Sequence, residues 1–68
     1  MMKICVRFQD KIIGCGVSLG DEVQWEGDVR QLRGIASHWE KQGYKGEALL
    51  GKMLERLRGR MWAQELEE

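Results

Sequence analysis

The sequence is short of several residues that define common classes of protein. It has no proline, one histidine, two cysteines and no net charge, because eleven Lys and Arg balance eleven Asp and Glu. No apolar run approaches the ~20 residues that span a bilayer, and the first residues lack the apolar core of a signal peptide. These absences argue against a membrane protein and predict a cytoplasmic one.

The cysteine and histidine content argues against a metal or disulfide scaffold. Two cysteines are too few for such a scaffold, and no CxxC pair is present. A zinc site would need Cys5, Cys15 and His38, which the expected fold scatters over different faces. We therefore expect reduced thiols, no metal and no cofactor.

What is present describes one small globular domain, residues 1–68. Hydrophobic residues make up 43% of the chain and charged residues 32%, a balance typical of a folded chain. A chain of this length buries only roughly 60% of the surface that its unfolded form exposes. The core is therefore marginal, and a partner would add stability.

The first 27 residues alternate with period two, which predicts strands. With Asp10-Lys11 as a turn, Phe8 pairs with Ile13, Val6 with Cys15 and Ile4 with Val17, so that every apolar side chain lies on one face. This register places Cys5 on the opposite face from Cys15 and disfavours a disulfide between them. We expect a three-stranded antiparallel meander over residues 3–9, 12–19 and 22–26.

The rest of the chain recurs every three to four residues, which predicts helices. Asp28 is a good N-cap with Gln31 three residues later, and Gly43 suits a left-handed C-terminal position. Helices are expected at 29–42 and 47–66, antiparallel to each other and packed on one face of the sheet. The fold class is therefore α+β.

Catalysis is not indicated by any group of residues. Nucleophilic catalysis needs a base within reach of Ser or Cys, yet His38 lies on the helix face opposite the apolar stripe. Since no acid, base and nucleophile converge on one predicted face, we expect a non-enzymatic protein without a small-molecule substrate.

An apolar patch off the core stripe of the second helix indicates a protein-binding surface. Trp62 and Leu66 lie there beside Gly51 and Gly59, and mid-helix glycine costs roughly 1 kcal/mol relative to alanine. Close approach of another backbone would offset that cost, and Trp is a common interface anchor. This patch and the outer sheet face predict a small protein–protein interaction module, self-associating or adaptor-like.

The alternative is a nucleic-acid-binding protein. On the expected second helix Lys45, Lys52, Arg56 and Arg60 project within about 80° of one another. The neutral chain is divided by segment: residues 1–28 carry a net charge of −2, residues 29–64 carry +5 and residues 65–68 carry −3. A basic helical segment suits phosphates, although the sheet offers no run of exposed aromatics for base stacking.

Overall fold

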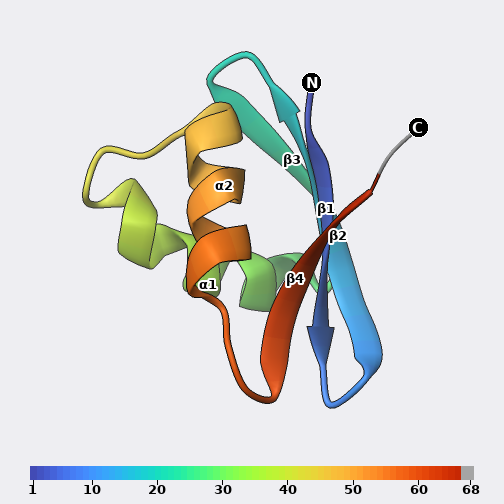
Figure 1. The fold of residues 1–68 in the computed structure, drawn as a ribbon. Helices are drawn as coiled ribbons and strands as arrows, with labels where there is room; N and C mark the ends of the chain where they lie inside the picture. Colours follow the sequence, from blue (N-terminus) through green and yellow to red (C-terminus); the bar gives the residue numbers. More distant parts are fainter. Residues whose placement is uncertain (67–68) are drawn as a thin grey trace.

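The computed structural model describes residues 1–66 and contains four strands and two helices (Figure 1). In chain order the elements are β1 (Lys3–Phe8), β2 (Lys11–Leu19), β3 (Glu22–Gly27), α1 (Val29–Glu40), α2 (Gly46–Arg56) and β4 (Met61–Leu66). The strands form one antiparallel sheet in the order β3-β2-β1-β4. Figure 1 shows both helices on the same side of this sheet, so the fold is α+β in two layers.

The meander of the first three strands is confirmed, but the second helix is shorter than predicted. We predicted a helix over 47–66; α2 ends at Arg56, and residues 61–66 form the edge strand β4. Leu57 is already extended, with φ −71° and ψ 126°, and Gly59 turns the chain with φ 72°. Pairing with β1 satisfies backbone groups along one side of β4, which a frayed helical end would leave to water.

The register between β1 and β2 is also different from the predicted one. The turn consists of Gln9 and Asp10, both with positive φ, one residue earlier than predicted. Val6 therefore pairs with Gly14 and Ile4 with Gly16, and Ile13 is the extra residue of a bulge. Pairing between β2 and β3 shifts in the same way.

The two glycines explain why this register is stable. They lie on the helix side of the sheet, not on the outer side as predicted, and a Cβ at Gly14 would overlap the Leu32 side chain. A Cβ at Gly16 would overlap the Trp25 ring. Side chains from α1 and β3 thus fill the space that β2 leaves empty, and the core needs no large residue at either position.

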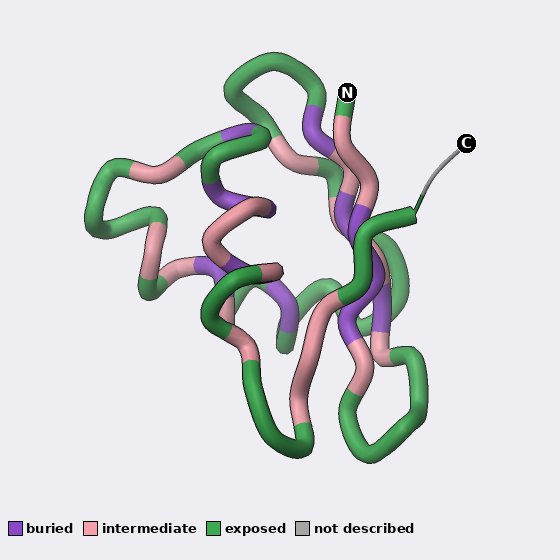
Figure 2. Tube along the Cα trace, viewed as in Figure 1, coloured by how far each residue is buried: buried purple, intermediate pink, exposed green. Residues whose placement is uncertain are grey.

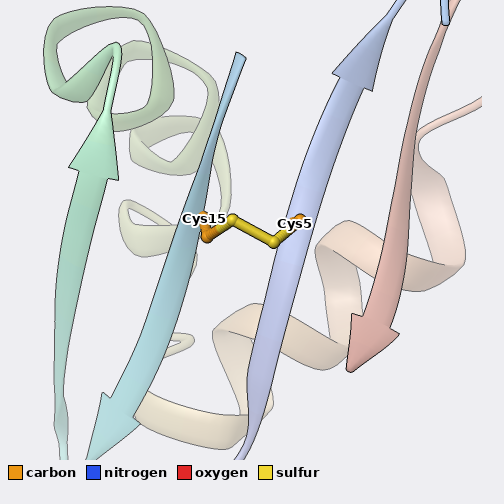
Figure 3. Close-up of a disulfide and its surroundings, with 2 residues drawn as sticks. All are labelled: Cys5 and Cys15. Carbon is orange, nitrogen blue, oxygen red and sulfur yellow. A yellow bond between two sulfur atoms is a disulfide. The ribbon is translucent and has the colours of Figure 1, made fainter. Parts of the chain in front are cut away.

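The same register brings the cysteines together, contrary to our prediction. Cys5 pairs directly with Cys15, and the two form a disulfide between the central strands β1 and β2 (Figure 3). Both side chains share the sheet face that the helices leave uncovered, because Ile4 and Val6 on either side of Cys5 point into the core. The expectation of two reduced thiols is therefore wrong for this structure.

The core lies between the helices and the inner sheet face, where the buried segments of Figure 2 meet. It consists of residues from the inner faces of both helices and from β1: Ile4, Val6, Leu32, Ala36, Leu49, Leu50 and Met53. The predicted start of α1 is confirmed, since the Gln31 amide donates to Asp28 Oδ1 at 3.2 Å. Gly43 has the predicted left-handed backbone, with φ 97°.

Candidate functional site

The outer face of the sheet is the candidate site, because no helix covers it (Figure 1) and it carries exposed apolar side chains. Ile12 is 51% exposed, Leu19 44% and Leu66 38%. Val17 is half-buried on the same face. Ile12 and Leu19 stand at opposite ends of β2 and Leu66 stands on β4, so the exposed apolar side chains are distributed over the face. Exposed apolar side chains on an open sheet face are often found at protein-binding surfaces.

Trp62 and Leu66, two predicted partner-binding residues, lie on this face although they belong to a strand instead of a helix. Trp62 pairs with Arg7 and Leu66 with Lys3 across β1 and β4. The Arg7 guanidinium lies over the Trp62 ring, with its carbon 5.5 Å from the ring centroid. Arg7 also donates from Nη1 to the Asp10 carbonyl at 3.3 Å, which holds the guanidinium in place.

Gly51 and Gly59, the other two predicted partner-binding residues, do not join this surface. Gly59 belongs to the turn before β4, where its positive φ explains the glycine. Gly51 lies in α2, on the other layer of the fold, and a Cβ there would meet nothing within 4 Å. Neither glycine is explained by a close neighbour in the chain.

The charges of the outer face are separated by strand. Lys3 and Arg7 stand on β1, whereas Glu22 and Glu26 stand on β3. Glu26 pairs with Cys15, which pairs with Cys5, so Glu26 lies at the level between Lys3 and Arg7 along the strands. The face therefore has a cationic row and an anionic row, with β2 between them.

The four basic residues predicted to bind nucleic acid do not all lie together in the structure; we call this set the basic ridge. Its members are Lys45, Lys52, Arg56 and Arg60. Lys45 precedes α2 and pairs with Asp21 at 3.5 Å, and Arg60 lies in the turn before β4. Only Lys52 and Arg56 remain together, one helical turn apart on α2. Glu55 approaches both, with its oxygens 3.9 Å from Lys52 Nζ and 3.8 Å from Arg56 Nε.

Lys52 and Arg56 line a hollow between the helices together with aromatic residues. The hollow has a volume of about 370 Å³, and its other lining residues are His38, Trp39, Gln42 and Tyr44. Lys52 Nζ lies 5.0 Å from the centroid of the Tyr44 ring, and His38 meets Trp39 edge-on at 5.3 Å. Cations beside aromatic rings are the groups that contact phosphate and base in single-stranded nucleic acid.

Within residues 1–66, no three His, Cys, Asp or Glu side chains gather closely enough to hold a metal ion. His38 is exposed and hydrogen-bonds Gln42, and its ring makes no hydrogen bond to a Ser or Cys side chain in this part of the chain. In the same described range, no helix has both the length and the apolar character to cross a membrane. The acidic tail of residues 65–68 extends beyond the described part of the chain.

Sequence reasoning missed the disulfide, and with it the place of Cys15, Val17 and Glu26 on the outer face. Residues 61–66 read Met-Trp-Ala-Gln-Glu-Leu and do not alternate between apolar and polar, so the sequence carried no clear signal for a fourth strand. Leu57 and Met61 also fit a helical stripe, which favoured the helix. Gly14 and Gly16 were the signal for the other register, since two glycines at that spacing leave room for side chains from elsewhere.

No model of a known protein family, no curated protein and no solved structure matches this chain.

Proposed function

We propose that the protein is a small non-enzymatic interaction module that self-associates through the outer face of its sheet. The observation that carries this proposal is the distribution of charge on that face: Lys3 and Arg7 on β1, Glu22 and Glu26 on β3, with exposed apolar residues between them. Such a surface is complementary to a second copy of itself.

The arrangement follows from two-fold symmetry. In a two-fold dimer a residue i that contacts j on the partner is matched by j contacting i. When the axis runs along β2 in the plane between two facing sheets, β1 of one copy lies over β3 of the other. Arg7 and Lys3 then flank Glu26 of the second copy, and both ion pairs form twice. An axis across the strands would instead place β1 over β1 and oppose like charges.

The apolar residues supply the attraction and the charges select the orientation. Ile12, Val17 and Leu19 on β2 would be removed from water when two sheets pack about 10 Å apart. Charged groups at the rim contribute more to orientation than to affinity. The disulfide supplies part of the stability that so small a core lacks, so the proposal rests on the face and not on a need for a partner.

Charge reversal gives a direct test. Arg7→Glu alone sets two carboxylates against each other at the contact with Glu26, and Glu26→Arg alone sets two guanidinium groups against each other at the contact with Arg7. Each variant should therefore sediment as a monomer where the wild type is a dimer. Mixing the two variants restores opposite charges at both contacts and should restore the dimer. The control is Arg30→Glu, a reversal of equal size on the exposed face of α1.

Different results would refute self-association and this particular interface. A monomeric wild type at the highest soluble concentration would refute self-association. Dimers that persist in both single variants would refute this interface, as would failure of the mixture to dimerise while both variants retain the wild-type circular dichroism spectrum.

We propose single-stranded nucleic-acid binding at the hollow between the helices as the second candidate function. The observation that supports it is the placement of Lys52 over Tyr44, with Arg56 beside them. The test is fluorescence anisotropy with labelled oligonucleotides at low salt. Lys52→Gln with Arg56→Gln should abolish binding, whereas Arg30→Gln with Lys41→Gln, which removes the same charge elsewhere, should reduce it only slightly. No binding by the wild type would refute this candidate.

The cytoplasmic location remains part of the proposal. Cytosolic proteins are normally kept reduced by the cellular thiol pool. A disulfide in such a protein must either resist that pool or exchange with it, and the surroundings of the bridge bear on this choice.

A further inference from the structure

The Cys5–Cys15 bridge lies on the uncovered face of the sheet, between the two central strands (Figure 3). We propose that this bridge is a thiol–disulfide exchange site, at which an external thiol attacks Cys15 and releases Cys5 as the thiolate. The proposal does not depend on self-association, because every group that it uses belongs to one chain.

Access to the two sulfurs is unequal. Cys5 is 5% exposed, since its strand has β2 on one side and β4 on the other. Cys15 is half-buried and lines an open hollow of about 260 Å³ on the β2–β3 side, together with Ile12 and Glu26. The hollow does not include Cys5 among its lining residues. An incoming thiolate therefore reaches the Cys15 sulfur first.

The charged residues near the two sulfurs also differ, with cations near Cys5 and an anion beside Cys15. Lys3 and Arg7 precede and follow Cys5 by two residues on the same strand and the same face, so that their Cα atoms are about 7 Å from that of Cys5 along the strand. Cys15 has Glu26 as its direct neighbour on β3. Cations stabilise a thiolate and an anion destabilises it. Cys5 is therefore the better leaving group, because leaving-group thiols that form stable thiolates depart faster.

The exchange conserves atoms and electrons. In the first step the external thiolate forms a bond to Cys15 Sγ, the Sγ–Sγ bond breaks, and its electron pair remains on Cys5 Sγ. When the reagent is a dithiol, its second thiolate attacks its own sulfur in the mixed disulfide and releases Cys15 as thiolate. The dithiol is oxidised to a disulfide, the protein gains two electrons, and solvent protonates the released sulfurs. The required reductant is thus a dithiol, or two equivalents of a monothiol.

Glu26 also restricts the reagent. Its carboxylate stands beside the mouth of the hollow, while Ile12 makes the wall apolar. A neutral or cationic thiol should therefore react faster than an anionic one of equal thiolate concentration. The natural partner that fits is a dithiol carried on an apolar or basic surface.

The first experiment locates the attack on the native protein. Excess reduced glutathione is added, the reaction is quenched with acid, free thiols are alkylated, and cleavage after Lys11 separates the two cysteines for mass spectrometry. We expect glutathione on Cys15 and the alkyl group on Cys5. Glutathione mainly on Cys5, or a bridge that reacts only after unfolding in urea, would overturn the proposal.

The second experiment measures the rate of reduction by dithiothreitol in charge variants. Arg7→Gln and Lys3→Gln should each slow reduction, by at most about threefold, which is the effect of a unit charge at about 7 Å in water, and Glu26→Gln should accelerate it. Arg30→Gln is the matched control and should leave the rate unchanged. A variant that merely loosens the fold would accelerate reduction, so equal or faster rates in the Arg7 and Lys3 variants would also overturn the proposal.

The result is separable from the dimer test. The exchange experiments are run on dilute protein, where association is absent. A monomeric protein with the expected exchange pattern would remove the proposed dimer and leave the exchange site intact.

Discussion

The guanidinium of Arg7 lies over the indole ring of Trp62, 5.5 Å from its centroid, and so connects the central strand β1 with the edge strand β4. Both residues stand on the outer face of the sheet, where the Trp62 side chain is half-buried. Arg7 is thereby placed in the cationic row that the proposed dimer uses.

Substitution of Arg7 and Trp62, singly and together, should measure the interaction between them. In a double-mutant cycle with Arg7→Gln and Trp62→Ala, we expect an interaction free energy of about 0.5–1 kcal/mol in unfolding of the monomer. Urea unfolding followed by circular dichroism gives the four values. Strict additivity of the two single variants would show that the pair contributes nothing.

Truncating the ring should affect association only through Arg7. In the proposed dimer β4 extends past β3 of the second copy, so Trp62→Ala is expected to raise the dimer dissociation constant by about two- to threefold, as the loss of the contact that places Arg7. Sedimentation equilibrium measures the constant. Phe8→Ala removes an aromatic ring from the inner side of the same strand pair, and it should affect unfolding more than association.

The disulfide should contribute measurably to stability. Cys5 and Cys15 close a short loop, for which the chain-entropy estimate is about 2–3 kcal/mol. The double variant Cys5→Ala, Cys15→Ala should lose about this much in its free energy of unfolding, as determined in urea. A loss below about 0.5 kcal/mol would indicate that the hairpin is held closed without the bridge.

The two glycines of β2 should tolerate no side chain, in contrast with Gly34 of α1. Gly14→Ala is expected to cost about 1–3 kcal/mol, because the new methyl group would overlap Leu32 and the Glu26 carbonyl. Gly34→Ala is the control: nothing lies within 4 Å of its Cβ position, and alanine should stabilise α1 by about 0.5–1 kcal/mol. Equal effects of the two substitutions on the thermal midpoint would contradict this account of the core.

Substitution of the N-cap residue of α1 should reduce the free energy of unfolding by a smaller amount than loss of the disulfide. Asp28→Ala removes the acceptor for the Gln31 amide and should cost about 1 kcal/mol, whereas Asp28→Asn should retain most of the stability. Thermal unfolding of the two variants measures the difference. Similar losses in both would show that the carboxylate charge, and not the hydrogen bond, is what stabilises the helix end.

Local signals in the sequence predicted the parts of the fold that depend on neighbouring residues. The Asp28 cap, the left-handed Gly43 and the meander of the first three strands follow from short-range chemistry. The register of β1 and β2 did not, because it depends on Leu32 and Trp25, which occupy the space above Gly14 and Gly16 from elsewhere in the chain.

The candidate site was predicted in the same uneven way. Trp62 and Leu66 were predicted to bind a partner because they do not fit the helical stripe, and the strand β4 explains why they do not fit it. The basic ridge was drawn on a helix that ends at Arg56, so Arg60 is not part of it. Residues 57–60 form the connection between α2 and β4, and pairing with β1, which begins at Met61, determines that residues 61–66 are a strand.

The strand order has a consequence for how the chain folds. β1 obtains its second neighbour from residues 61–66, which are more than fifty positions away in the sequence. During synthesis the first hairpin therefore exists with one open edge until the last strand has left the ribosome, and pairings between such distant segments form slowly. In that interval the bridge would be the only covalent restraint on the nascent sheet, and the unpaired edge of β1 would be its most exposed point for wrong association.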